Sequence, residues 1–87
     1  MEAVLEELTC DRAKERGWQH RKVGWIGRRN APDHFFGKAG VGGFFVEFKK
    51  PNKWPTPTQR REIEFMRECG LTVHVINSLE AAYALFD

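Results

Sequence analysis

The feature that most constrains the fold is a strand-like run in the middle of the chain, FFVEFK at residues 44–49. Side chains alternate between the two faces of a strand, so the Phe, Val and Phe at even-numbered positions share one face. Glu47 and Lys49 share the opposite face with Phe45. Pro51 follows and ends the run, because proline cannot continue the hydrogen-bonded ladder of a sheet. The run therefore predicts a strand with one apolar face and one face that carries an acid and a lysine together.

Glycines and prolines divide the rest of the chain into short elements. Apolar residues recur at helical spacing over residues 3–16, and Gly17 is expected to end that helix. Thr56, Pro57 and Gln59 predict another helix start, with threonine as the N-cap, proline as the first helical residue and glutamine completing a capping box. The expected elements are a helix at 3–16, strands at 18–25, 33–36 and 44–49, a helix at 57–69, a strand at 71–76 and a helix at 79–86.

This order, αβββαβα, predicts an α/β fold with a mixed sheet. The hairpin-rich first half implies antiparallel neighbours, and the four glycines of residues 37–43 are expected to form the turn between two strands. A strand–helix–strand crossover follows, which implies parallel pairing with helices packed on the sheet. We expect residues 1–87 to form a single domain, because 87 residues is near the lower end of what folds alone.

Composition argues against several classes of protein. No apolar run approaches the roughly 18 residues needed to span a bilayer. The acidic N-terminus also differs from the basic, then apolar, order of a secretion signal, so we expect a cytoplasmic protein without membrane contact. Cys10 and Cys69 are too few for a disulfide framework and lack zinc-ligand spacing. We therefore expect both cysteines to be small apolar fillers on helices.

Positive charge is concentrated in the middle of the sequence. Residues 18–61 contain ten lysines or arginines and two acids, whereas the flanking segments contain four basic and ten acidic residues. A basic block in a chain of net charge +2 is typical of a protein that meets phosphates. The alternative is a solvated basic face without a partner. The two acids within the block are Asp33 and Glu47.

Asp33 and Glu47 are candidate ligands of a divalent metal ion. Asp33 begins the strand that precedes that of Glu47 in a hairpin, so the two carboxylates can converge on one Mg²⁺ or Mn²⁺ ion. The backbone carbonyl of Phe48 is a further candidate ligand. Lys49 would lie beside the metal, where an ammonium can orient water or stabilise negative charge in a transition state. The alternatives are that Glu47 and Lys49 form an exposed ion pair and that Asp33 is a turn residue.

Contacts with DNA phosphates are expected from the basic residues around these acids, and such contacts position a duplex without reading its sequence. Trp54 follows Lys53 on an exposed-looking loop, where it is either a loop residue or a stacking platform for a base. Trp18 and Trp25 are expected to pack in the core instead. The candidate DNA contacts are Arg28, Arg29, Lys38, Lys50, Lys53, Trp54, Arg60 and Arg61.

Three motifs resemble those of the virus-type replication-repair nuclease (VRR-NUC) family. They are APD at residues 31–33, FVEFK at residues 45–49 and TPTQ at residues 56–59. The chain resembles the stand-alone phage form of the family over nearly its whole length. Because the family is a branch of the PD-(D/E)XK nucleases, the resemblance implies a restriction-endonuclease-like core. The expected location is then the cytoplasm of an infected bacterium if the protein is phage-encoded.

The resemblance also implies roles for individual residues. Asp33 and Glu47 would be metal ligands, and Lys49 would be the catalytic lysine. Gln59 would be a supporting active-site residue, a role that can coexist with its place in the capping box.

A glutamate of the first helix would complete the site, because family members carry one about eleven residues before the glycine that ends this helix. Glu6 lies eleven residues before Gly17 and would reach the metal directly or through water. Glu2 and Glu7 are weaker candidates. His34 departs from the family pattern, in which an apolar residue usually follows the Pro-Asp pair. We interpret it as a structural histidine in polar surroundings and not as a catalytic base.

The activity that the resemblance implies is that of a structure-specific endonuclease dependent on Mg²⁺ or Mn²⁺. Its expected substrate is branched double-stranded DNA, such as a Holliday junction, in phage replication, recombination or repair. A homodimer is the expected working unit, because a small chain rich in aromatic residues has apolar surface left to bury. A junction also needs two opposed cuts. The alternatives are a DNA-binding module with an inactive site, a monomeric flap- or nick-directed nuclease, and an interaction protein without nucleic acid.

Overall fold

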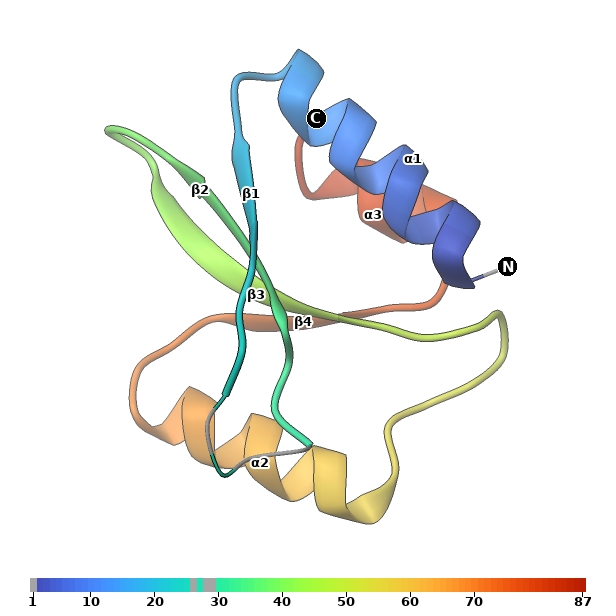
Figure 1. Ribbon diagram of the computed structural model, residues 1–87, viewed down its shortest axis with the longest axis vertical. Coiled ribbons are helices and arrows are strands. Elements are labelled where there is room, and N and C mark those ends of the chain that lie inside the picture. Colours follow the sequence, from blue (N-terminus) through green and yellow to red (C-terminus); the bar gives the residue numbers. More distant parts are fainter. Residues whose placement is uncertain (1, 26, 28–29) are drawn as a thin grey trace.

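The computed structural model describes residues 2–25, 27 and 30–87 of the chain. Within these residues, three helices and four strands follow the order αβββαβα, as predicted (Figure 1). Helices and a mixed sheet confirm the expected fold class. The elements are α1 (Glu2–Glu15), β1 (Gln19–Lys22), β2 (His34–Lys38), β3 (Gly42–Phe48), α2 (Pro57–Glu68), β4 (Val73–Ile76) and α3 (Leu79–Ala84).

The strands of the described residues form one sheet in the order β1-β2-β3-β4. β1, β2 and β3 are antiparallel neighbours, whereas β4 pairs with β3 in parallel after the crossover through α2. In the β2–β3 ladder, His34 lies opposite Val46. Antiparallel register therefore brings Asp33, one residue before β2, level with Glu47 near the end of β3.

Helices cover both faces of the sheet. Figure 1 shows α1 and α3 together on one side and α2 on the other. Phe44, Val46 and Phe48 of β3 are buried in the core cluster beneath α1 and α3, which confirms the predicted alternation. Ile63 and Met66 of α2 form a second, smaller cluster on the other face. None of the helices in the described segments is long and apolar enough to cross a bilayer.

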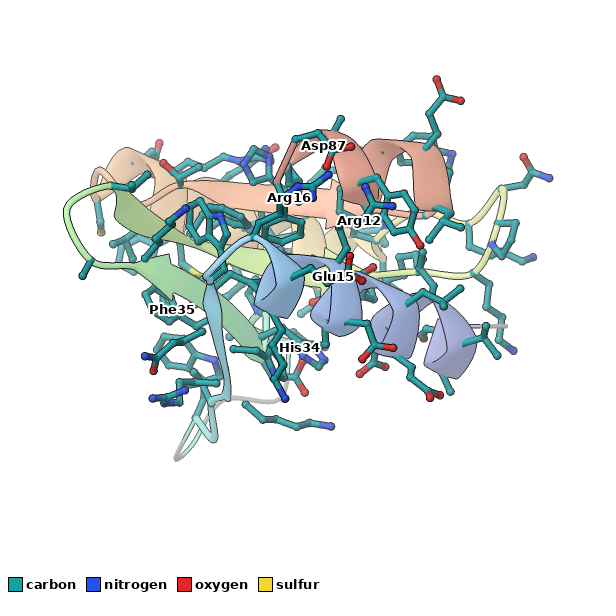
Figure 2. The ribbon with its side chains drawn as sticks, turned by 90° about the horizontal axis from the view of Figure 1, so that it is seen from above. Arg12, Glu15, Arg16, His34, Phe35 and Asp87 are labelled. Atoms are coloured by element: carbon teal, nitrogen blue, oxygen red, sulfur yellow. The ribbon has the colours of Figure 1, made fainter. Side chains whose placement is uncertain are left out.

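Helix α1 is fixed to α3 and to the C-terminus by charged contacts. Arg12 and Arg16 each place a guanidinium nitrogen 3.1 Å from Oδ1 of Asp87. Figure 2 shows the three side chains near one another. The Arg12 guanidinium also lies over the ring of Tyr83, 3.9 Å from its centroid. These contacts join the C-terminal end of α1 to α3 and to the last residue of the chain.

Phe35 explains why the β2–β3 hairpin is rich in glycine. The prediction that residues 37–43 form the turn is wrong in length, because the turn covers residues 39–41 and the flanking glycines belong to the strands. A Cβ atom on Gly37 would lie 2.9 Å from the Phe35 ring, and one on Gly43 would lie 2.5 Å from it. Both glycines therefore make room for an aromatic ring that lies across the sheet.

The first two tryptophans pack inside the molecule, as predicted. The Trp18 ring meets those of Phe44 and Phe86, with centroids 5.3 and 5.6 Å apart. The indole N–H of Trp25 donates to the carbonyl of Pro32 at 2.7 Å. The first strand is shorter than predicted, because β1 covers Gln19–Lys22 and ends before Trp25.

The two cysteines differ in burial. Cys10 on α1 is partly buried and packs against the larger core cluster, in line with the predicted filler role. Cys69 is exposed at the C-cap of α2, so the same prediction is wrong there. The physical reason is that the last turn of α2 lies at the surface of the molecule.

Candidate active site

Acidic side chains meet where β2 begins and β3 ends. A pocket of about 180 Å³ lies there, between the first two turns of α1 and the strands. Asp33 and Glu47, the two acids of the basic block, both line it. We call this hollow the acidic pocket. Its lining residues are Glu2, Glu6, Lys22, Asp33, His34, Glu47 and Phe48.

Strand β3 and the residue after it place Glu47 and Lys49 side by side. The ammonium nitrogen of Lys49 lies 3.7 Å from Oε2 of Glu47. The Lys49 and Glu47 side chains are 18% and 14% exposed, so the alternative of an exposed ion pair does not hold. A pair withdrawn from solvent interacts more strongly than a surface pair, because less water and salt screen its charges.

The carboxyl group of Glu47 has an unusual affinity for protons. Burial raises its pKa to about 7. The nearby negative charges of Asp33 and Glu2 act in the same direction, whereas Lys49 opposes them. A divalent cation would relieve both the burial cost and the repulsion between the carboxylates. Strongly shifted groups in a cleft are typical of functional sites.

Helix α1 contributes two acids from successive turns. Glu2 and Glu6 are four residues apart and therefore share a helix face, and both line the acidic pocket. Glu7 is exposed and is not among the lining residues that the structure describes. Of the three glutamates considered from the sequence, the structure thus brings Glu6 and Glu2 to the strand acids and leaves Glu7 outside.

His34 is the buried side chain between α1 and the strand acids. It is 6% exposed, with Nε2 3.0 Å from Oε1 of Glu6 and 3.4 Å from Oδ1 of Asp33. Figure 2 shows the side chain directly beside α1. Its ring meets that of Phe48 edge to face, with centroids 4.9 Å apart. These contacts are those of a histidine held in polar surroundings next to the candidate ligands.

His20 is a neighbour of the site that sequence reasoning missed. Its Nε2 lies 2.8 Å from Nδ1 of His34, and the two rings are stacked with centroids 5.1 Å apart. Burial and the adjacent His34 lower the pKa of His20. The available clue was the presence of histidines on two predicted neighbouring strands. The register that makes them neighbours does not follow from the sequence pattern.

Gln59 has the helix-capping role. Its side-chain oxygen accepts a hydrogen bond from the backbone N–H of Thr56 at 3.0 Å, and its own backbone N–H donates to Oγ1 of Thr56 at 3.2 Å. The predicted capping box is therefore confirmed. Gln59 is not among the described residues that line the acidic pocket. The structure does not bring its amide to Asp33 and Glu47.

The candidate DNA contacts occupy different parts of the molecule. Arg28 and Arg29 lie outside the described residues. Trp54 is 67% exposed on the loop between β3 and α2. Lys38 lies at the opposite end of β2 from the acidic pocket, where its ammonium donates to the carbonyl of Arg16 at 2.7 Å. The remaining candidates, all exposed on the loop after β3 and the first turns of α2, are Lys50, Lys53, Arg60 and Arg61.

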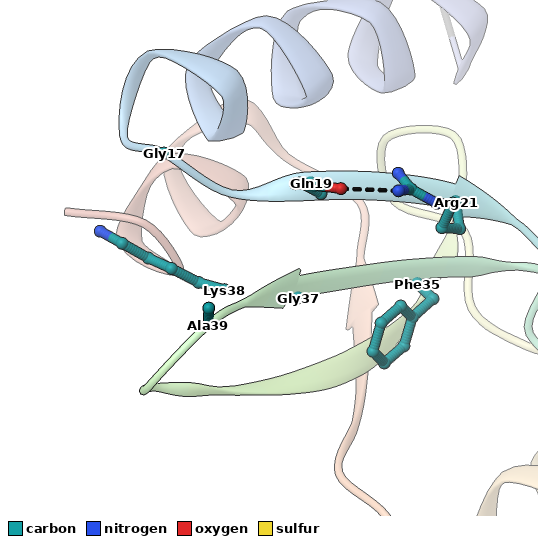
Figure 3. A pocket seen from close by; sticks show the side chains of 7 residues that line it. All are labelled: Gly17, Gln19, Arg21, Phe35, Gly37, Lys38 and Ala39. Atoms are coloured by element: carbon teal, nitrogen blue, oxygen red, sulfur yellow. Dashed lines mark hydrogen bonds between the residues drawn. The ribbon is translucent and has the colours of Figure 1, made fainter.

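A larger hollow of about 460 Å³ lies along the β1–β2 hairpin, around Phe35 and Lys38 (Figure 3). Within it, the guanidinium of Arg21 donates to the side-chain oxygen of Gln19 at 2.6 Å. No acid occurs among its described lining residues. Despite its size, this hollow lacks the groups for hydrolytic chemistry, so the smaller acidic pocket is the better candidate site.

The donor groups of the acidic pocket fit a hard cation such as Mg²⁺. Carboxylate oxygens are the ligands that Mg²⁺ prefers, and the ion keeps several of its waters, so one or two direct carboxylates suffice. Within the part of the chain that the structure describes, no three His, Cys, Asp or Glu side chains are already arranged to hold a metal ion.

Comparison with known proteins places the chain among solved structures of one kind. No family model and no curated protein matches the sequence. A solved structure described as a VRR_NUC domain is 32% identical with a TM-score of 0.88, over 97% of this chain and 91% of that chain. Another, described as a VRR_NUC domain protein, is 16% identical with a TM-score of 0.72, over 97% and 83%. The second likeness concerns the fold alone, whereas the first extends to the sequence.

Proposed function

The chain belongs to the VRR-NUC family and is a nuclease-type domain, and on this basis we propose that it is a metal-dependent DNA endonuclease acting at the acidic pocket. One observation carries the proposal. The two acids of an otherwise basic block meet in this pocket, where burial raises the pKa of Glu47 to about 7. Carboxylates held together in this way bind a divalent cation readily, because the cation removes their mutual repulsion.

Asp33 and Glu47 are the proposed direct ligands of Mg²⁺ or Mn²⁺, together with the backbone carbonyl of Phe48. Glu6 completes the site from α1, directly or through water. When bound, the ion supplies a Lewis acid for the scissile phosphate and lowers the pKa of water. The protein supplies the positions of these oxygens, which the β2–β3 register and the face of α1 determine.

Lys49 is the proposed catalytic lysine. Its ammonium lies 3.7 Å from Glu47 and is 18% exposed, so it can donate hydrogen bonds next to the candidate ligands without being fully solvated. In that position it orients water or stabilises negative charge that develops on the phosphate. Gln59 supports the site only through the geometry of the α2 start, in keeping with its capping contacts.

The proposed substrate is branched double-stranded DNA, such as a Holliday junction, cleaved by a homodimer. The exposed basic side chains after β3 and on the first turns of α2 would position the DNA backbone, and Trp54 is available to stack on an unpaired base. A two-fold dimer presents two acidic pockets at related positions. Two pockets match the two opposed cuts that a junction requires.

Two rival functions make different predictions. A DNA-binding module with an inactive site would retain DNA affinity without cleavage. That function does not explain why the Glu47–Lys49 pair is largely removed from solvent. A monomeric flap- or nick-directed nuclease would use the same pocket once per molecule. DNA cleavage and the mass of the protein in solution distinguish these functions, whereas the fold does not.

The experiment is incubation of the full chain with supercoiled plasmid and with a cruciform DNA labelled on each strand, in Mg²⁺, Mn²⁺ or EDTA. We expect paired cuts on opposed strands of the cruciform with either metal and none in EDTA. Light scattering at micromolar protein should give the mass of a dimer. Binding without cleavage in any metal would favour the inactive module, whereas a monomeric mass with single, uncoupled nicks would favour the flap- or nick-directed enzyme.

A further inference from the structure

Two histidines connect the acidic pocket to the interior of the sheet. Each of the two ring nitrogens of His34 faces a different side chain. Nε2 faces Glu6 at 3.0 Å, and Nδ1 faces Nε2 of His20 at 2.8 Å. Three side chains from three elements, α1, β2 and β1, thereby lie in one row of polar contacts at 3.0 and 2.8 Å.

The direction of this row follows from its carboxylate end. An ionised carboxylate only accepts hydrogen bonds, so the neutral tautomer of His34 that fits the 3.0 Å contact with Glu6 has its proton on Nε2. A neutral imidazole then has a bare Nδ1, which accepts from the Nε2–H of His20. The tautomers of His34 and His20 are thus both determined by the position of Glu6.

Packing fixes the rings in this arrangement. His34 is stacked on His20 with an interplanar angle of 23° and meets the ring of Phe48 edge to face. His20 lies in turn against Phe36, with centroids 4.9 Å apart. The Glu6 side chain, by contrast, is 32% exposed, with Oε1 3.0 Å from Nε2 of His34.

We propose that His34, backed by His20, is a positioning residue that holds the Glu6 carboxylate toward Asp33 in the acidic pocket. A free glutamate side chain samples several rotamers, so a fixed donor removes much of the entropy that Glu6 would lose on binding an ion. Nε2 of His34 also lies 3.4 Å from Oδ1 of Asp33, so one ring nitrogen faces both carboxylates. This inference rests on the proposed metal-dependent function in its last step, whereas the direction of the histidine chain does not.

The first test is the tautomer of His34 in the metal-free full chain, read from long-range ¹H–¹⁵N spectra of the histidine rings. We expect a protonated Nε2 and a bare Nδ1 for His34, and a protonated Nε2 for His20. A His34 ring with its proton on Nδ1, or with both nitrogens protonated, would overturn the proposed direction and with it the positioning role.

The second test measures Mn²⁺ affinity by electron paramagnetic resonance for three variants. His20→Phe keeps a ring on Phe36 but removes the donor, and it should weaken Mn²⁺ binding by about tenfold, as loss of an outer-sphere partner does. His20→Gln retains an amide N–H for Nδ1 of His34 and should stay within about threefold of the wild type. His74→Phe is the matched control, because His74 packs edge to face on Phe44 and is not among the described lining residues of the acidic pocket.

Melting temperatures of the three variants separate this role from a purely structural one. Unchanged Mn²⁺ affinity in His20→Phe, with a wild type that binds Mn²⁺, would overturn the positioning role and leave the proposed function intact. If His20→Phe fails to fold, His20→Gln provides the test instead. A tenfold loss of Mn²⁺ affinity in His20→Gln would then overturn the positioning role. A wild type that binds no Mn²⁺ and cleaves no DNA would instead overturn the proposed function, and the positioning role with it.

Discussion

The two sides of the acidic pocket are held in opposite ways. On the α1 side, the buried His34 lies between Glu6 and His20, with contacts of 3.0 and 2.8 Å. Towards α2, outside the described lining of the pocket, the ammonium of Lys49 lies 3.7 Å from Glu47, and Gln59 uses its side-chain oxygen to cap its own helix. Polar contacts fix the side chains on the α1 side, whereas the residues towards α2 continue into an exposed basic loop.

This difference separates two tasks that an endonuclease must combine. Ligand positions must be precise, and precision comes from side chains whose rotamers are fixed by packing and hydrogen bonds. Substrate engagement tolerates mobile cations, because phosphate contacts depend mainly on charge. We therefore expect substitutions at the pocket and at Lys49, the partner of Glu47, to alter chemistry, and substitutions of the exposed basic residues after β3 and on α2 to alter DNA affinity.

The largest expected effect comes from the strand acids. Glu47→Gln or Asp33→Asn should reduce metal-dependent cleavage by at least about 1,000-fold, because each removes a proposed metal ligand. Affinity for DNA in EDTA, measured by gel shift, should be unchanged or tighter, since a negative charge near phosphate is lost. Full cleavage by either purified variant would show that the acidic pocket is not the active site.

A comparison of Lys49→Met with Lys50→Met tests the boundary between the two sides. Lys49 lies beside Glu47, as strand alternation predicts, whereas Lys50 is exposed. Lys49→Met should lower the single-turnover rate at saturating enzyme by about 100-fold and leave Mn²⁺ binding intact. Lys50→Met should mainly raise the apparent Kd for DNA. If the two variants behave alike, the argument from strand alternation is wrong.

Glu6→Gln and Glu7→Gln form a matched pair on α1. Glu6 lines the acidic pocket and contacts His34, whereas Glu7 is exposed. We expect Glu6→Gln to reduce cleavage by about tenfold or more, and Glu7→Gln to have no effect beyond about twofold. The reverse ranking would move the helix ligand away from the histidine chain.

The smallest expected effect is on the pH dependence of stability without metal. The pKa of Glu47 is about 7 in the folded chain against an ordinary value of 4.5. The folded state therefore binds more protons between these values, so this group's contribution to stability falls as pH rises from about 4.5 to above 7.

Chemical denaturation at pH 5 and pH 8 in EDTA should show this loss in the wild type. Glu47→Gln should reduce the loss by on the order of 1–3 kcal/mol, because glutamine does not titrate. An equal loss in wild type and variant would show that Glu47 does not carry the shifted pKa.

Much of the fold could be predicted because its local patterns are strong. The alternation around Glu47, the capping box at Thr56 and the glycine after α1 each identify an element without tertiary information. The extent of the β2–β3 strands could not be predicted, since the glycines that suggest a turn are required by the ring of Phe35. That requirement exists only after the strands have paired.

The candidate site shows the same division. The pairing of Asp33 with Glu47 follows from a hairpin between two recognisable strands, and charge distribution marks both acids. The contact between His20 and His34 depends on the β1–β2 register, which a weakly patterned strand does not specify. The raised pKa of Glu47 likewise depends on burial and on Glu2, which reaches the pocket only once α1 is docked.

The central claim is that the acidic pocket binds a divalent ion through Asp33 and Glu47. Isothermal titration of the metal-free full chain with Mn²⁺ at neutral pH, for the wild type and for Glu47→Gln, tests it most directly. We predict one Mn²⁺ site per chain in the wild type, with proton release on binding because the pKa of Glu47 is about 7. Glu47→Gln should bind at least about 100-fold more weakly and without that proton release. Equal Mn²⁺ affinity of the two proteins would contradict the account.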